Sequence, residues 1–379
     1  MSWEINSLDN IITFQRGFDL PKNDFKKGCF PVVGSTGIIG YHNDYKVKSP
    51  CVVTGRSGTL GVFQFLDEDF WAHNTTLWVK DFQENDPKFI FYLLQTLDFK
   101  SLNGGVAVPT LNRNVLKNVF ISYPKSVQTQ KRIASILSTY DDLIENNLKR
   151  IKLLEETAQN IYKEWFVNFR FPNYENTPFN EETGLPVGWE VKKLSELYNT
   201  SSGGTPKRDN PNYYEGNIKW FRTNELQDNF LIDSELHISE DALKNSSAKL
   251  FPKNTVLMAM YGATIGRLGV LTEEASTNQA CCGIIPINEN FGNSFIYYWL
   301  LKNREHILSL RMGAAQENIS QTIIKDLEVI KPSSIILKEF NSKIDKINEI
   351  KINLTIQNQK LKEARDILLP RLMNRTIEV

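Results

Sequence analysis

The side chains that most often carry catalysis or bind metals occur in this chain, but their spacing fits neither chemistry. The four cysteines, at positions 29, 51, 281 and 282, show no CxxC spacing, so the sequence predicts reduced, structural cysteines and no zinc site. The acidic stretch Asp67–Trp71 lacks the following lysine of a nuclease motif and is interpreted as a solvated hairpin end. We therefore expect no catalytic residues and no metal site.

Two loops contain residue types that hold bases or phosphates in other proteins. Asn210–Tyr213, which reads NPNY, is similar to the Asn-Pro-Pro-aromatic loop of amino-methyltransferases, but the second proline is missing and no glycine-rich cofactor loop follows a strand. Gly203–Lys207, which reads GGTPK, lacks the GxxxxGKS/T spacing with which backbone amides hold phosphates. Both are interpreted as plain loops, and the chain is expected not to be an enzyme by itself.

Polar side chains in glycine-punctuated loops are the remaining candidates for a functional site. Arginine pairs with the edge of guanine, and asparagine or glutamine with that of adenine, so such loops suit the reading of DNA bases. The first half of the chain offers Ser35, Thr36, Tyr41, Arg56, Ser57, Thr59, Asn74 and Arg113. The second half offers Lys207, Arg208, Lys219, Arg222, Asn224, Tyr261, Thr264, Arg267, Asn278, Gln279, Gln316 and Asn318. Taken singly, each is most simply an exposed loop residue, but the set recurs at equivalent places in both halves.

The second half of the chain repeats the first. Trp3-Glu4 aligns with Trp189-Glu190 at an offset of 186 residues, and Asn74 in HNTT aligns with Asn278 in TNQA. Further on, the segments 105–124 and 313–332 align without a gap at an offset of 208. The second copy therefore carries about 22 extra residues, and we place most of them in the Gly-, Pro- and Asn-rich loop at 201–217.

Each copy ends in a long amphipathic helix. Apolar residues recur every three or four positions from Ile133 through Leu148 to Trp165, and again from Phe340 to Leu368. The uninterrupted first segment allows a helix of about 38 residues, or roughly 57 Å at 1.5 Å per residue.

Two helices of matched length in one chain favour an antiparallel coiled coil. A polar residue on the apolar stripe, Asn358, also favours pairing, because a buried asparagine fixes the register of a coiled coil. The alternative is that each helix packs only on its own domain.

The sequence thus alternates globular heads with helices. Strand signals such as CVVTGRSGTLGVFQF are short, β-rich and separated by glycine turns, so each head is predicted to be mostly sheet. The predicted fold is α+β, with two similar mostly-β heads separated by two long antiparallel helices in a pseudo-twofold repeat. The predicted boundaries are 1–126 for head 1, 127–170 for the first helix, 171–188 for a linker, 189–332 for head 2 and 333–379 for the second helix.

Charge and hydropathy limit the possible partners. Lys plus Arg equals Asp plus Glu at 44 each, so no global field attracts a polyanion and any nucleic-acid surface must be local. No apolar run reaches the roughly 18 residues that span a bilayer, and the N-terminus has no signal-peptide pattern. We expect a cytoplasmic protein without a membrane partner.

The order of motifs along the chain resembles that of the specificity subunits of type I restriction-modification enzymes. The resemblance covers essentially the whole chain and rests on YKEWFVNFRFP at 162–172, GLPVGWEVKKLSEL at 184–197, SSGGTPKRDNPNYYEGNIKWFRTNEL from 201, MYGATIGRLGV at 260–270 and the two helices. One departure is the scarcity of helical sequence before Trp3, so the C-terminal helix would have to complete the helical pair alone.

The resemblance implies that the heads are target recognition domains, each reading one half of a split, asymmetric site in double-stranded DNA. It also implies that the helices space the heads and dock two methyltransferase subunits, and that motor-nuclease subunits join the assembly. The chain itself would bind no cofactor, whereas S-adenosylmethionine, ATP and magnesium would belong to the partner subunits. A duplicated, diverged chain can read two unlike half-sites, whereas symmetry confines a homodimer to palindromes.

A second class of function stays open, a non-catalytic scaffold whose heads bind protein partners. The zero net charge fits it, while the paired Arg- and Lys-bearing loops favour DNA. Salt dependence separates the two, because phosphate contacts make affinity fall steeply with salt and a protein interface need not.

Overall fold

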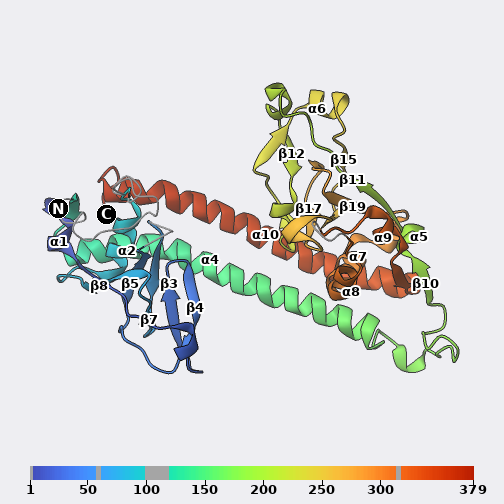
Figure 1. Ribbon diagram of the computed structural model, residues 1–379, viewed down its shortest axis with the longest axis horizontal. Helices are drawn as coiled ribbons and strands as arrows, with labels where there is room; N and C mark the ends of the chain where they lie inside the picture. The colour runs from blue at the N-terminus through green and yellow to red at the C-terminus, as the bar shows by residue number, and fades with distance from the viewer. Residues whose placement is uncertain (1–2, 57–60, 99–118, 313–316) are drawn as a thin grey trace. The chain divides into compact units, whose positions relative to one another are not determined.

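The chain folds into two compact units that each contain one head. The computed structural model describes residues 3–56, 61–98, 119–312 and 317–379. Unit 1 comprises Met1–Asn146 and Asn358–Val379, and unit 2 comprises Asn147–Gln357. Each of the two long helices therefore contributes one part to each unit (Figure 1).

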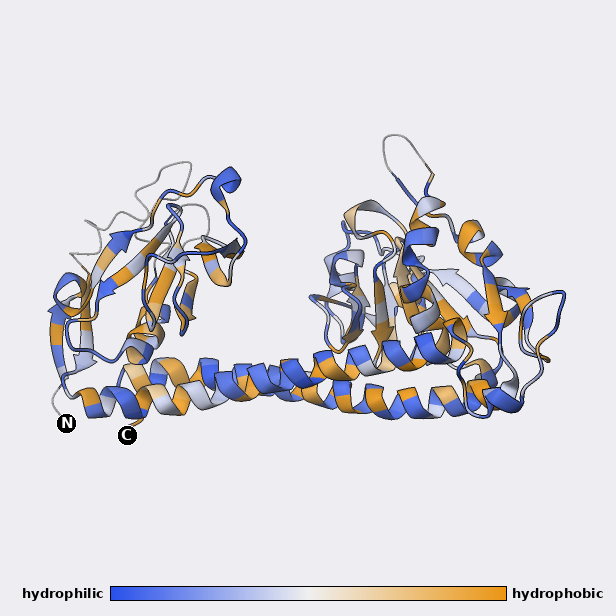
Figure 2. Cartoon of the chain, turned by 90° about the horizontal axis from the view of Figure 1, so that it is seen from below, coloured by the Kyte–Doolittle hydropathy of each residue, from blue (hydrophilic) through white to orange (hydrophobic). Residues whose placement is uncertain are grey.

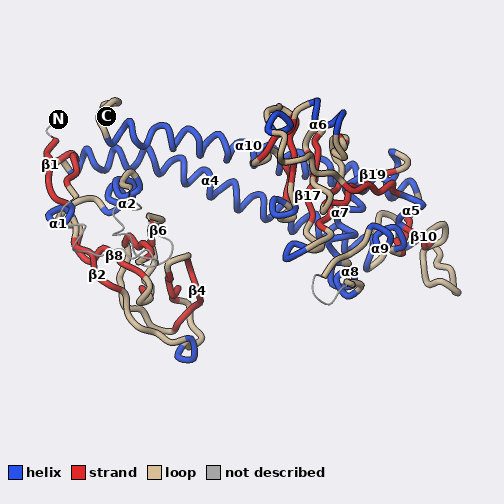
Figure 3. The backbone as a smooth tube through the Cα atoms, turned by 45° about the horizontal axis from the view of Figure 1, so that its top comes forward, coloured by secondary structure: helices blue, strands red, loops and turns tan. Residues whose placement is uncertain are grey.

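Head 1 consists of two small sheets, a two-stranded ribbon and short helices (Figure 3). The first sheet has the order β2-β8-β5-β6, from β2 (Thr13–Arg16), β8 (Thr76–Asp81), β5 (Cys51–Gly55) and β6 (Phe63–Leu66). The second has the order β4-β3-β7, from β4 (Gly37–His42), β3 (Phe30–Gly34) and β7 (Trp71–Ala72). The ribbon pairs β1 (Trp3–Ser7) with β9 (Phe120–Pro124), and the helices are α1 (Leu8–Ile11) and α2 (Pro87–Gln95).

Head 2 repeats this strand order and adds one edge strand to each sheet. Its first sheet has the order β11-β19-β16-β17-β13, from β11 (Tyr198–Ser202), β19 (Cys281–Pro286), β16 (Val256–Ala259), β17 (Leu268–Leu271) and β13 (Asn229–Leu231). The second has the order β14-β12-β18-β15, from β14 (Leu236–Ile238), β12 (Ile218–Phe221), β18 (Ala275–Thr277) and β15 (Leu250–Phe251). The ribbon is β10 (Glu190–Lys193) with β20 (Glu328–Lys331), and the helices are α5 (Leu194–Leu197), α6 (Glu240–Asn245), α7 (Asn293–Lys302), α8 (Arg304–Ser309) and α9 (Gln321–Asp326). The predicted α+β class and internal repeat are confirmed.

The placement of the extra residues of head 2 in the loop at 201–217 is wrong. The parallel strand pair of head 1 joins Val32 to Trp71, and the equivalent pair of head 2 joins Trp220 to Ser276. The offset between equivalent residues is therefore 188 at β12 and 205 at β18. Most of the added chain therefore follows β12. It forms β13, α6 and β15, which are regular elements and carry no loop-like composition.

The two long helices pair antiparallel in both units. Helix α4 spans Val127–Tyr162 and continues into a π-helical turn at Lys163–Val167, and α10 spans Ser334–Met373. In unit 1 the Asn358 side-chain amide donates to the Ile144 carbonyl at 3.4 Å, and Arg365 pairs with Asp141. In unit 2 Lys351 pairs with Glu155. Among these contacts, the residue numbers on α10 decrease as those on α4 increase, which confirms the predicted antiparallel pairing.

Apolar residues of the helices alternate with polar ones along the pair (Figure 2). Ile133 and Leu137 on α4 and Phe340 and Ile344 on α10 are fully buried, as the predicted stripes require. Leu148 was also placed on the stripe, but it is 55% exposed. This part of the prediction is wrong, because the neighbouring Asn147, which is 7% exposed, occupies the buried face at this turn.

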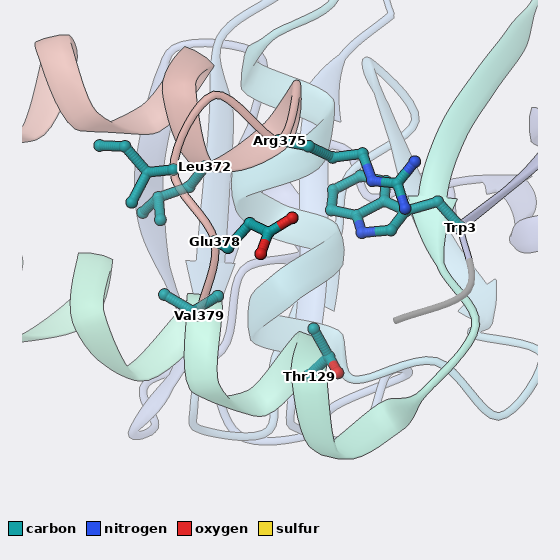
Figure 4. A pocket seen from close by; sticks show the side chains of 7 residues that line it. Trp3, Thr129, Leu372, Arg375, Glu378 and Val379 are labelled. Atoms are coloured by element: carbon teal, nitrogen blue, oxygen red, sulfur yellow. The ribbon is translucent and has the colours of Figure 1, made fainter.

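The far end of each helix completes the core of the other helix's head. In unit 2, Phe166 of α4 packs edge-on against Phe295 of α7 and Phe340, with ring centroids 5.0 and 4.8 Å apart. In unit 1, Leu372 and Met373 of α10 join the core cluster of head 1. The residues after α10 continue this contact, since the Arg375 guanidinium lies 5.2 Å from the centre of the Trp3 ring, beside a cavity of about 120 Å³ (Figure 4).

In the described part of the chain, no helix combines the length and the apolar character that a membrane crossing would need.

Candidate nucleic-acid interface

The polar candidates of head 1 gather where three strands end. Strands β3 and β7 are parallel, and the His73 amide donates to the Val33 carbonyl at 2.9 Å, so both strands end on the same side. Strand β5 ends there too, because the Arg56 amide donates to the Thr75 carbonyl at 2.8 Å. We define the head 1 polar edge as Arg16, Asp19, Ser35, Thr36, Arg56 and Asn74.

Head 2 builds the same kind of edge from the equivalent strands. Strands β12 and β18 are parallel, and the backbone amide of Asn278 donates to the Phe221 carbonyl at 3.0 Å. Strand β16 ends beside them, because the Met260 amide donates to the Ala280 carbonyl at 2.8 Å. We define the head 2 polar edge as Thr205, Lys207, Arg208, Arg222, Asn224, Tyr261, Thr264, Arg267, Asn278, Gln279 and Asn318.

A glycine at the same place in each head lets two chain segments meet at the edge. The Gly17 amide donates to the Thr76 carbonyl at 3.1 Å, and the Gly203 amide donates to the Cys281 carbonyl at 3.1 Å. A Cβ at Gly17 would lie 2.0 Å from the His73 carbonyl oxygen, and a Cβ at Gly203 would lie 2.1 Å from a side-chain oxygen of β18. Only glycine allows this approach.

These hydrogen bonds correct one alignment of the repeat. Cys281 takes the place of Thr76, so Asn74 corresponds to Gln279 and not to Asn278. The side chains agree, because Asn74 is hydrogen-bonded to Asp19 and Gln279 to Thr205. The asparagine that HNTT and TNQA share favours an alignment of the two heads that is shifted by one residue from the alignment that the hydrogen bonds give.

Several of the predicted cations of head 2 are held by carboxylates of the same head. Arg267 Nη1 lies 2.6 Å from Asp228 Oδ2, and the same carboxylate also binds Arg304. Arg222 pairs with Glu235, and Lys219 pairs with Glu273. A phosphate or base could gain these cations only by sharing them with, or displacing, the carboxylates.

Other predicted cations have no such partner. Among the described residues, no carboxylate lies within ion-pair distance of Lys207, Arg208 or Arg56, and the first two are exposed. Lys207 and Arg208 follow Thr205 in the loop that joins β11 to β12. These three side chains are therefore free to meet a polyanion without breaking an ion pair.

The remaining candidates lie elsewhere. Tyr41 is 52% exposed but lies on β4 opposite Pro31, away from the end of β3. Lys219 lies within β12, where its ammonium also donates to the Ile232 carbonyl. Four candidates fall outside the described residues, namely Ser57, Thr59, Arg113 and Gln316.

Sequence reasoning missed several residues that shape the two edges. Arg16 and Asp19 lie at the head 1 polar edge with their side chains 3.8 Å apart, and Thr205 takes the place of Asp19 in head 2. The available signal was that the offset of 186, which aligns Trp3 with Trp189, also aligns Gly17 with Gly203. No comparable signal marks Asp228, whose partners are distant in sequence.

The motifs considered for catalysis have structural roles. Asn210 precedes a 3₁₀ turn at Pro211–Tyr214 that contains the rest of the NPNY motif, and the Tyr214 hydroxyl donates to the Pro206 carbonyl at 2.8 Å. The cysteines are unpaired thiols, and burial raises the pKa of Cys51 and of Cys282 to about 12, so both stay protonated. In the described ranges, no group of three His, Cys, Asp or Glu residues is arranged to hold a metal ion.

Comparisons with known proteins agree with this frame. The family model described as "Type I restriction modification DNA specificity domain" matches residues 1–156 and 186–363. The MjaIX type I specificity subunit of Methanocaldococcus jannaschii is 30% identical over 294 residues, which cover 76% of this chain and 68% of the relative. The HindI specificity subunit of Haemophilus influenzae is 25% identical over 387 residues, which cover 83% of each chain.

A solved structure shares the fold over nearly its whole length. It is the S subunit of a type I restriction-modification system from M. genitalium, with a TM-score of 0.65 at 17% identity, covering 98% of this chain and 96% of that chain. Because the family model spans both repeats, the match extends to the duplicated organisation. The chain therefore belongs to the family of type I restriction-modification specificity subunits, the non-catalytic subunits of these enzymes.

Proposed function

We propose that this chain reads a bipartite, asymmetric DNA site, with the polar edge of each head contacting one half-site. The paired helices α4 and α10 set the spacing of the two half-sites. The candidate contacts are the described residues of the two polar edges, together with the predicted residues Tyr41, Ser57, Thr59, Arg113, Lys219 and Gln316.

One observation carries the proposal: the two heads place different side chains at equivalent positions of one strand frame. Asn74 and Asp19 in head 1 correspond to Gln279 and Thr205 in head 2. Amide side chains suit adenine, and hydroxyl and carboxylate oxygens accept from other base edges. The two polar edges share one strand arrangement but present different hydrogen-bonding groups. They are therefore suited to read two different base sequences.

The proposed partners follow from the family. Two methyltransferase subunits dock on the helices, and motor-nuclease subunits join them. S-adenosylmethionine, ATP and magnesium bind to those partner subunits. We place the complex in the cytoplasm, because its proposed ligand is cellular double-stranded DNA.

The test is a map of methylated bases in DNA exposed to the chain together with its methyltransferase partner. We expect a motif of two specific blocks separated by a gap of unspecified bases. Exchanging residues 1–126 for the first head of another family member should change one block and leave the other intact, because residues without shared contacts act nearly independently. A continuous motif, or a change in both blocks, would contradict the proposal.

The isolated chain should neither methylate nor cut DNA, and should bind DNA weakly until the methyltransferase partner is added. Methyl transfer by the purified chain alone would contradict this. The scaffold alternative predicts that the heads capture a protein and that DNA affinity, if any, changes little between 50 and 200 mM salt, whereas six or more phosphate contacts would reduce it by ~1,000-fold or more.

A further inference from the structure

The two long helices correspond residue by residue at an offset of 207. The backbone amide of Gln130 donates to the Ser126 carbonyl at the start of α4. The backbone amide of Leu337 donates to the Ser333 carbonyl at the equivalent place at the start of α10. The buried residues then match in order: Ile133 with Phe340, Leu137 with Ile344, Tyr162 with Leu369 and Trp165 with Leu372. Each position of one helix therefore has a defined equivalent in the other.

In unit 1, a tyrosine, an acid and a base join the head to both helices. The Tyr92 hydroxyl on α2 donates to Asp141 Oδ2 of α4 at 2.5 Å. The other oxygen of Asp141 accepts from Arg365 Nη1 of α10 at 2.5 Å. The side chains of Arg365 and Asp141 are only 20% and 31% exposed, so Asp141 depends on Arg365 for its charge balance, while Arg365 also pairs with Asp366 of α10. We call this group clasp 1.

In unit 2, an equivalent tyrosine joins a second acid and base. The Tyr298 hydroxyl on α7 donates to Glu155 Oε2 of α4 at 3.2 Å, and Lys351 of α10 pairs with the same oxygen. The Lys351 side chain is only 6% exposed and its ammonium lies 5.0 Å from the centre of the Phe230 ring. We call this group clasp 2.

The charges of the clasps break the symmetry of the repeat. In both clasps the acid belongs to α4 and the base to α10. A symmetric repeat would instead give each head the same charge on its own helix. Here head 1 has an acid on the helix that follows it, and head 2 has a base there.

A second copy of either helix could not replace its partner in the same register. At the offset of 207, Ala158 of a second α4 would take the place of Arg365, and Ile144 would take the place of Lys351, so both acids would lose their bases. In a pair of α10 helices, Asn348 would face Arg365 and Lys362 would face Lys351. Lys351 is 6% exposed, and the two acids are half-buried, so the loss of a partner is destabilising at each of these sites.

The ends of the helices differ in size as well. Head 2 receives Tyr162, Trp165 and Phe166 from α4, all of them buried. At the equivalent positions, head 1 receives the smaller Leu369, Leu372 and Met373 from α10. An aromatic end forced into the core of head 1 would overpack it, which costs stability in a close-packed interior.

We propose that the two halves of this chain recognise each other as unlike partners, so that α4 pairs with α10 and rejects a second α4. The clasps supply the charge complementarity and the helix ends supply the fit. Every helix pair thereby carries one head of each kind, whatever DNA the heads bind.

The experiment uses the full chain with a protease site inserted between Glu181 and Glu182, which are exposed in the linker. The folded chain is cut, unfolded in urea and refolded, and native mass spectrometry counts the N·C, N·N and C·C pairs of the two fragments. Random pairing gives N·C only twice as often as each like pair. We expect N·C to exceed each like pair by at least ~20-fold, because an N·N pair leaves the half-buried Asp141 and Glu155 of both copies without their bases.

Matched variants separate the clasps from general effects of charge. Neutralising the clasps with Asp141→Asn, Glu155→Gln, Lys351→Gln and Arg365→Gln should move the ratio toward two. Neutralising four exposed charges on the same helices with Asp142→Asn, Glu156→Gln, Lys346→Gln and Lys360→Gln should leave it unchanged. Random pairing of the wild-type fragments, or full exclusion of like pairs by the clasp-neutral variant, would overturn the proposal.

Two further measurements cover poor refolding. If the clasp-neutral chain does not refold, exchanging acid and base within each clasp restores both pairs and should recover the wild-type ratio. If the wild-type fragments do not refold, the cut chain is incubated under native conditions with an isotope-labelled cut copy. Only mixed-label N·C pairs should then form, and N·N pairs would overturn the proposal.

Discussion

Heads 1 and 2 share a strand order but differ in what they place at its polar edge. Both bring a parallel strand pair and a third strand end together, and both use a glycine to let a neighbouring segment cross closely. Head 2 inserts β13, α6 and β15 without disturbing that frame. The difference teaches that the frame fixes where side chains lie, while the residues at the edge vary independently of it.

The edges also differ in how their cations are balanced. Head 2 holds Arg222 and Arg267 in ion pairs and leaves Lys207 and Arg208 free, whereas Arg56 is the free cation of the described part of the head 1 edge. A chain with zero net charge can thus present local positive sites. Zero net charge is therefore weak evidence against a DNA-binding role.

The largest expected effect comes from filling the glycine crossing of one head. Gly17→Val places new atoms on the His73 carbonyl, where a Cβ alone would lie at 2.0 Å, so we expect the crossing to open at a cost of about 3 kcal/mol in stability and to displace the polar edge from its half-site. The measurement is the affinity of the assembled complex for duplexes with either half-site altered. Gly17→Val should abolish discrimination at one half-site only.

Gly203→Val is the matched control, because it fills the same crossing in head 2. It should abolish discrimination at the opposite half-site and leave the first intact. If both variants impaired the same half-site, the heads would not read separately.

A smaller effect is expected from lengthening the paired helices. Adding four residues after Lys149 and four after Gln357 lengthens each helix by about 6 Å, at 1.5 Å per residue. Against roughly 3.4 Å per base step, the gap between the half-sites should grow by one or two base pairs. Bending of the DNA to absorb the added rotation costs on the order of a few kcal/mol, so some affinity is lost.

Mapping of methylated motifs reports this gap directly. A variant with four residues added to α4 alone is the control, since it shifts the helical register and should lose activity. An unchanged gap with full activity in the doubly lengthened chain would show that the helices do not measure the distance.

The smallest effect concerns the free cations. Lys207→Ser with Arg208→Ser should weaken binding to all sequences alike and reduce the slope of log affinity against log salt by ~1.8, or about 0.9 for each lost phosphate contact. Arg56→Ser should reduce this slope by ~0.9, the value for one lost phosphate contact. Lys253→Ser, which removes a cation at the opposite end of β16, is the control and should leave the slope unchanged. Equal slopes in all variants would remove these residues from the DNA interface.

Much of the fold was predictable from the sequence because the repeat and the helical periodicity are local or regular signals. The antiparallel helices followed from two apolar stripes of similar length, and Asn358 indeed faces the partner helix. The extra residues of head 2 were misplaced because composition marks loops, whereas the insertion folded into regular elements. The predicted alignment of Asn74 with Asn278 is wrong by one residue, because only the backbone hydrogen bonds between the strands fix this alignment.

The state of the candidate site was less predictable. The residues of the polar edges could be chosen by type, but a single sequence does not show which cations are free. Arg267 is held by Asp228, and Lys219 by Glu273, across separations of 39 and 54 residues. Such pairs depend on strand order, which the sequence alone left undetermined.

The central claim is that the chain is one reading module duplicated and diverged, with one half-site for each head. Its most direct test is a chain in which residues 189–332 are replaced by a second copy of residues 3–126. Tyr162, Trp165 and Phe166 are changed to Leu, Leu and Met in the same chain, so that the second copy keeps the helix end that fits it. Base-resolved mapping with the methyltransferase partner should then show a palindromic motif made of the first half-site and its inverted repeat. A motif that still contains the original second half-site would contradict the account.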